Sequence, residues 1–110
     1  MIVTPSSTVP GRQIARSFGL VYGNTIRARH VGNDILAALK GLIGGEISEY
    51  TKMMAEAREQ AMDRMKASAA NLGADAVVNV RFTTAYVMRN AAEILAYGDA
   101  VRLDDESPDS

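Results

Sequence analysis

The fold is decided by the stretch Leu72-Gly73-Ala74-Asp75-Ala76-Val77-Val78, where a helical pattern changes into a strand pattern. Before it, apolar residues recur every three or four positions from Ile47 to Leu72, which is the spacing of an amphipathic helix. Gly73 suits the position after a helix cap, because glycine accepts a positive φ without a steric penalty. The sequence therefore predicts a helix over 47–72 that leads directly into a strand.

The predicted helix has one apolar stripe, and charged residues occupy much of its other face. Ser48 is placed to cap the first turn, and Glu49 suits the positive end of the helix dipole. The stripe consists of Tyr50, Met54, Ala57, Ala61, Met65, Ser68 and Leu72. Because alanine allows a backbone to approach closely and methionine adapts to irregular surfaces, we expect this stripe to lie on a sheet.

Two strand patterns follow the helix. In the first, alternation predicts two faces: Ala76, Val78, Val80 and Phe82 on one, and Val77, Asn79, Arg81 and Thr83 on the other. Residues 88–91 predict a turn, and Ala92–Leu103 predicts the second strand, in which Gly98 indicates a bulge or a close contact. The connection is too short for a parallel crossover, so we expect an antiparallel pair.

The N-terminal third predicts an arm and one more strand. Met1–Arg16 reads as an extended, turn-rich arm, within which residues 2–4 have the composition to pair at a sheet edge. Residues 20–28 read as a strand interrupted at Gly23-Asn24. A two-residue hairpin is the alternative there. We favour one strand with a bulge or bend, because each half is short for a strand by itself.

A short helix is predicted next, over residues 33–43, with Gly44-Gly45 as its end. The element order then gives an α/β (α+β) domain over 17–103, with a three-stranded antiparallel sheet packed by one long and one short helix. Residues 104–110 are acidic and predict a disordered tail. The last strand is apolar on both faces, so we expect a homo-oligomer that covers the second face.

Composition limits the class of protein. The 110 residues include no cysteine, which excludes disulfides and thiolate metal sites and fits a cytoplasmic protein. No stretch is long and apolar enough to predict a membrane span. The basic residues are scattered, there is no tryptophan, and the net charge is −1, so we expect no nucleic-acid partner. No nucleophile elbow, phosphate loop or metalloprotease motif is present, so no catalytic residue and no enzyme activity are predicted.

Several motifs occur in an order that resembles one family. They are Gly19-Leu-Val-Tyr-Gly23, Asp34, Ile43-Gly44-Gly45, Tyr50, Ala57-Arg58-Glu59 and Leu72-Gly73-Ala74-Asp75-Ala76-Val77-Val78. Together they resemble the YbjQ-like family of bacterial and archaeal proteins, which carry the label "putative heavy-metal-binding domain". The resemblance covers residues 18–103. It implies a dodecin-like subunit and a ring-shaped homopentamer, and it implies no established activity.

A metal site within one subunit is not predicted, because soft metals prefer thiolate or imidazole ligands and the chain has no Cys and one His. His30 and Asp34 are four residues apart and share a face if the helix begins early. Two ligands are too few for a closed zinc site. The remaining metal geometry places five copies of His30 at the axis of a ring. No other cofactor is expected.

Four residues are candidates for ligand binding: Asp34, Tyr50, Arg58 and Asp75. Each has a structural alternative. Asp75 pins the turn after the helix by accepting backbone N–H groups, Arg58 pairs with Asp34 or Asp75, and Tyr50 packs with its hydroxyl at the rim. The function predicted first is therefore a small-ligand or metal-ion binding module. The alternative is an interaction module that acts through its assembly.

Overall fold

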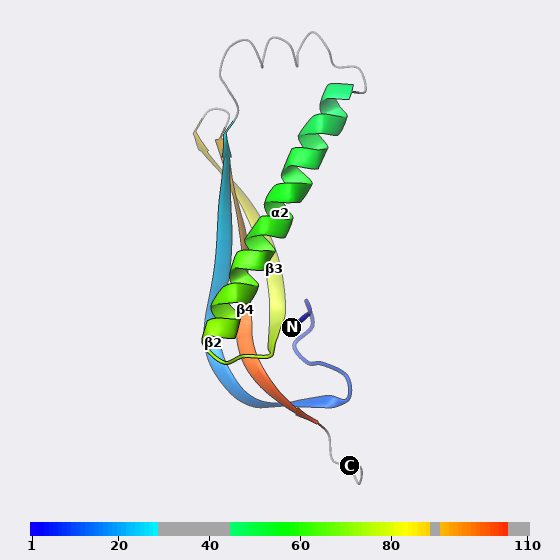
Figure 1. Ribbon diagram of the computed structural model, residues 1–110, viewed down its shortest axis with the longest axis vertical. Helices are drawn as coiled ribbons and strands as arrows, with labels where there is room; N and C mark the ends of the chain where they lie inside the picture. Colours follow the sequence, from blue (N-terminus) through cyan, green and yellow to red (C-terminus); the bar gives the residue numbers. More distant parts are fainter. Residues whose placement is uncertain (29–44, 89–90, 106–110) are drawn as a thin grey trace.

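The computed structural model describes residues 1–28, 45–88 and 91–105, which form an α+β domain (Figure 1). Its elements are β1 (Ile2–Val3), β2 (Arg12–Ala28), α2 (Gly45–Asn71), β3 (Ala76–Met88) and β4 (Ala91–Asp105). The strands form one sheet in the order β1-β3-β4-β2, and α2 crosses one face of it. The predicted helix over 33–43 lies outside the described residues.

The sheet is four-stranded and mixed, so the predicted three-stranded antiparallel sheet is wrong. The additional strand is β1, which pairs in parallel with β3 through Ile2↔Ala76 and Val3↔Val77. The predicted edge pairing of residues 2–4 is thereby confirmed, but two residues are too few to show an alternating pattern. The antiparallel pairing of β3 with β4 is also confirmed.

Strand β2 is longer than the predicted strand over residues 20–28, and it is more regular in its centre. One continuous strand runs from Arg12 to Ala28, which confirms a single strand and excludes the hairpin. The predicted interruption at Gly23-Asn24 is wrong, because these residues pair in register with Ala96 and Leu95 of β4. The irregularities lie nearer the start of β2, between Ile14 and Arg16 and between Ser17 and Gly19.

The ends of the sheet include residues that were expected outside it. Arg12–Arg16, the last part of the predicted arm, belongs to β2. Asp104 and Asp105, the start of the predicted tail, pair with Gln13 and Arg12. Polar residues dominate both segments, so they carry little apolar alternation from which a strand could be recognised.

The helix α2 ends as the sequence predicts. Gly73 has a φ of 92°, its N–H donates to the carbonyl of Ala70 over 3.0 Å, and the N–H of Ala74 donates to the carbonyl of Ala69 over 3.1 Å. This pair of hydrogen bonds is a Schellman motif, which satisfies carbonyls that the end of a helix leaves unpaired. It turns the chain back to the sheet, where β3 begins three residues later.

The helix lies on the sheet through small side chains. Its fully buried face consists of Ala57, Ala61, Met65 and Ala69, spaced by four residues, whereas Ser68 and Leu72 of the predicted stripe are exposed. The hydroxyl of Thr25 donates to the carbonyl of Ala57 over 3.0 Å. Gly23, two residues before Thr25 on β2, lies directly beneath the helix backbone. A Cβ at this position would collide with the carbonyl oxygen of Ala61 and the backbone nitrogen of Met65.

A bulge in β3 changes which residues face the helix. Val78 pairs with Asp99 but Arg81 pairs with Tyr97, so β3 holds one extra residue. Asn79 occupies the bulge with a φ of 56°, and its side-chain amide donates to Asp99 over 3.0 Å. Its N–H donates to the carbonyl of Ser6 over 2.9 Å. The arm and the bulge therefore hold each other in place.

The bulge makes the predicted alternation of β3 wrong beyond Val78. Val77 and Val80 both belong to the core beneath α2. Ala76 and Val78 instead pack on the opposite face with Val101 and Leu103, where Val9 of the arm partly covers them. The extra residue shifts the side-chain period by one position, so the side chains of β3 change face from Val80 as far as Tyr86, where the register shifts a second time.

Replacing Asn79 with valine is expected to lower the free energy of unfolding by roughly 2 kcal/mol, because a β-branched residue is strained at a positive φ. Asn79→Gly keeps the backbone conformation and loses the amide bond to Asp99, so a smaller loss of about 1 kcal/mol is expected. Thermal unfolding of both variants measures the difference. An equal loss in the two variants would contradict a conformational role for Asn79.

Candidate functional site

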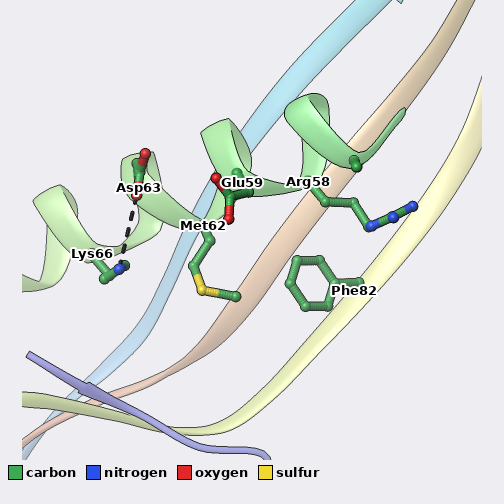
Figure 2. A pocket seen from close by; sticks show the side chains of 7 residues that line it. Arg58, Glu59, Met62, Asp63, Lys66 and Phe82 are labelled. Carbon is green, nitrogen blue, oxygen red and sulfur yellow. Dashed lines mark ion pairs between the residues drawn. The ribbon is translucent and has the colours of Figure 1, made fainter. Parts of the chain in front are cut away.

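Two hollows flank α2. The first, here called the helix–β3 groove, has a volume of about 390 Å³ and is lined by Ala55, Arg58, Glu59, Met62, Asp63, Lys66 and Phe82 (Figure 2). The second, here called the β2-side hollow, has a volume of about 520 Å³ and is lined by residues 20–24, Arg64, Ser68, Asn71 and Leu72. Helix α2 thus lies between two concave surfaces, one beside β3 and the other beside β2.

The helix–β3 groove has an apolar floor and a charged rim. Met62 from α2 and Phe82 from β3 face each other across it, and the side chain of Arg58 extends toward Phe82 (Figure 2). Lys66 lies 3.8 Å from Asp63 one helical turn earlier. The rim carries two basic and two acidic side chains, so its net charge selects neither an anion nor a cation.

The β2-side hollow contains polar contacts between the helix and the sheet edge. Arg64 donates to the carbonyl of Asn24 over 2.6 Å. Further along the same flank, Arg27 donates to the side chain of Gln60 over 2.7 Å. These contacts, together with the buried Thr25 hydroxyl, fix α2 over β2. Each joins groups within the subunit, so none of these three contacts requires a ligand.

The structure does not bring the predicted site residues together. His30 and Asp34 lie outside the described residues, as does the side chain of Tyr50, whose backbone is in the first turns of α2. Arg58 lines the helix–β3 groove, whereas Asp75 follows the far end of α2. They are roughly 20 Å apart along the helix axis, so Asp75 is not the partner of Arg58 within one subunit.

Asp75 is hydrogen-bonded to two strands, β1 and β4. Its carboxylate accepts the N–H of Leu103 over 2.9 Å. Its own N–H donates to the carbonyl of Val101 over 3.0 Å, and its carbonyl accepts the N–H of Ile2 over 3.3 Å. Asp75 therefore joins β1 and β4 at the point where β3 begins. This is the structural alternative considered from the sequence, in which the carboxylate pins the turn after the helix.

Asp75→Ala is expected to lower the free energy of unfolding by about 1 kcal/mol, because the N–H of Leu103 loses its acceptor. Asp75→Asn retains an oxygen at the same position and is expected to lose less than half as much. Urea unfolding at one protein concentration measures both values. If the two variants are equally destabilised, the charge of Asp75 rather than its hydrogen bond stabilises the turn.

The described residues restrict metal chemistry. Among residues 1–28, 45–88 and 91–105, no group of three or more His, Cys, Asp or Glu side chains is placed to hold a metal ion. In that same part of the chain, no helix has both the length and the hydropathy needed to cross a membrane.

The groove contains residues that the sequence reasoning missed. Met62, Lys66 and Phe82 were not chosen as site residues, although all three line the helix–β3 groove. Phe82 was expected to share a face with Ala76 and Val78, and the bulge at Asn79 places it on the helix side instead. The available signal for the bulge was Asn79 itself, because asparagine adopts a positive φ more readily than most residues. This preference is weak evidence for a bulge when the strand that pairs with β3 is not known.

Comparison with known proteins identifies the relatives of the chain. A family model described as "Putative heavy-metal-binding" (YbjQ-like) matches residues 1–104. A "UPF0145 protein" of Archaeoglobus fulgidus is 60% identical over 94% of this chain and 95% of its own length. A "UPF0145 protein" of Methanosarcina acetivorans is 52% identical over 94% and 97%, and one of Vibrio campbellii is 52% identical over 94% and 99%. The relatives thus include archaeal as well as bacterial proteins.

One solved structure supports the fold. It is the crystal structure of a protein of unknown function, of the DUF74 family, from Pediococcus pentosaceus. The TM-score is 0.64 at 18% identity, with 94% of this chain and 98% of that chain covered. At this identity the likeness concerns the fold alone. The match over nearly the whole chain and the relatives at 50–60% identity show that the protein belongs to the YbjQ-like (UPF0145) family.

Proposed function

We propose that the protein is an interaction module that acts through its own assembly into a ring-shaped homo-oligomer, most simply a dodecin-like homopentamer in the cytoplasm. The observation that carries the proposal is the row of exposed apolar side chains on β2. Leu20, Tyr22 and Ile26 are 66%, 59% and 57% exposed, and all three point away from α2. Water-exposed apolar side chains in a row indicate an interface, because isolated domains rarely leave such patches uncovered.

Assembly is favoured over the small-ligand or metal-ion module that the sequence placed first. A ligand site requires polar groups that converge on a cavity. Here Asp75 is engaged with the backbone of Leu103, and Arg58 lies at a distant groove with balanced charges. The family description names a heavy metal, and in this chain such an ion would depend on His30, the single histidine.

Native mass spectrometry of the purified protein tests the proposal. We expect one closed oligomer, with five copies as the leading stoichiometry, whose mass does not change on addition of Zn²⁺, Ni²⁺ or Cu²⁺. Metal taken up at one ion or five ions per ring, and lost in His30→Ala, would replace assembly with metal binding as the function. A monomer over the micromolar range would overturn the proposal itself.

A further inference from the structure

The four charged side chains on the rim of the helix–β3 groove differ in their partners. Asp63 and Lys66 are one turn apart on α2, and their charged atoms lie 3.8 Å from each other. In the described part of the chain, Arg58 and Glu59 form no hydrogen bond, ion pair or ring contact with another residue. One end of the groove therefore has a neutralised pair of charges, and the other end has two opposite charges without partners.

Arg58 and Glu59 do not neutralise each other because they are consecutive residues of α2. Consecutive side chains leave a helix about 100° apart and do not face each other. Met62 follows Arg58 by four residues and Glu59 by three, so both charged side chains are its neighbours on the helix surface (Figure 2). The groove thus presents one positive and one negative group beside the same apolar side chain.

The floor next to these charges is an uncovered apolar surface. Phe82 of β3 faces Met62 across the groove and is 43% exposed. The ring is uncovered because α2 packs chiefly over β2 and β4 and only marginally over β3 (Figure 1). The groove volume of about 390 Å³ is within the range of small-molecule sites. An aromatic or aliphatic group that lies on Phe82 removes this surface from water.

We propose that this end of the groove binds a free α-amino acid with a large apolar side chain, for which phenylalanine is the model. Such a molecule carries a carboxylate and an ammonium group on one carbon, next to its apolar side chain. Arg58 binds the carboxylate through the two parallel N–H groups of its guanidinium. Glu59 accepts hydrogen bonds from the ammonium group, and the apolar side chain lies between Met62 and Phe82.

The two charges select a zwitterion over a simple ion. An anion bound at Arg58 is repelled by the neighbouring Glu59, and a cation bound at Glu59 is repelled by Arg58. A zwitterion satisfies both side chains at once. A peptide does not, because its ammonium and carboxylate groups are at opposite ends of its chain. All these groups belong to one subunit, so the inference does not depend on the assembly proposed above.

Saturation-transfer NMR of the purified wild-type protein with L-phenylalanine tests the inference, and a titration gives the dissociation constant. Three analogues each remove one feature: 3-phenylpropionate lacks the ammonium group, L-phenylalaninamide lacks the carboxylate, and glycine lacks the apolar side chain. Each is expected to bind about tenfold more weakly, because a charged hydrogen bond or the contact with the floor is lost. The absence of saturation transfer to L-phenylalanine, or an analogue that binds equally well, would overturn the inference.

Variants assign the binding to the groove. Arg58→Gln and Glu59→Gln are each expected to weaken L-phenylalanine binding by about tenfold. Lys66→Gln is the matched control, because it removes a charge from the same rim that Asp63 already neutralises, and it is expected to change binding by less than about twofold. Unchanged binding in Arg58→Gln, or an equal loss in Lys66→Gln, would contradict the site.

Native mass spectrometry separates this inference from the proposed function. Each variant is expected to keep the oligomeric state of the wild type, because the substituted side chains are charged groups on the surface of α2. If a substitution changes that state, the analogue series on the wild-type protein decides the question without it. A monomeric wild type that binds L-phenylalanine would overturn the assembly and support the amino-acid site.

Discussion

Replacing Gly23 with alanine is expected to lower the free energy of unfolding by about 3 kcal/mol, the upper end of the usual range for overpacked cores. The added methyl group would overlap Ala61 O and Met65 N and lie 2.7 Å from the Cβ of Arg64. Two of these atoms belong to the helix backbone, which cannot rotate away as a side chain does. The whole of α2 would therefore have to lift from β2.

Urea unfolding of Gly23→Ala and wild type at one protein concentration measures this loss, since assembly makes stability depend on concentration. Ser17→Ala is the matched control, because it adds no atoms to an exposed position of the same strand. It is expected to change the free energy by less than about 0.5 kcal/mol. A loss below about 1 kcal/mol in Gly23→Ala would show that the helix does not depend on this close approach.

Gly98→Ala is expected to lower the free energy of unfolding by about 2 kcal/mol. The sequence predicted a bulge or a close contact at this glycine, and the structure shows a close contact opposite the bulge in β3. A methyl group would lie 2.8 Å from Val77 Cγ1, 2.8 Å from the carbonyl of Val78 and 3.2 Å from Val80 Cγ2. The Val78 carbonyl belongs to the sheet backbone and cannot move without breaking the pairing.

A double-mutant cycle identifies the source of the Gly98 effect. Val77 is fully buried, so Val77→Ala is expected to lower stability by itself, but it also removes one of the three colliding atoms. The double variant should be more stable than the sum of the two single effects predicts. Strictly additive effects would show that the strain comes from the Val78 carbonyl and Val80 rather than from Val77. An unchanged stability in Gly98→Ala would contradict the close contact.

The sequence predicts the elements whose signals are local. The long helix, its end at Gly73 and the antiparallel pair after it were recognisable because helical spacing, a glycine cap and alternation each lie within a few neighbouring residues. The same reasoning shows why β2 is a single strand. In these elements each local preference agrees with the tertiary structure, so the sequence alone predicts them correctly.

The remaining features depend on residues that are distant in sequence. The bulge at Asn79 is fixed by Ser6 and Asp99, and only the fold brings those residues together. The parallel pairing of β1 has no pattern of its own because it spans two residues. For the candidate site, the sequence offered Asp75 as one of two acidic partners for Arg58, but the length of α2 between them separates the two residues within one subunit.

The pairing of β2 with β4 has a consequence for synthesis of the chain. Some 60 residues separate the end of β2 from the start of β4, and a ribosome needs roughly 3 to 12 seconds to add them. During that interval β2 has been translated without its partner strand. A chaperone that binds nascent apolar segments would find Leu20, Tyr22 and Ile26 in one extended stretch, and the sheet closes only when translation has passed β4.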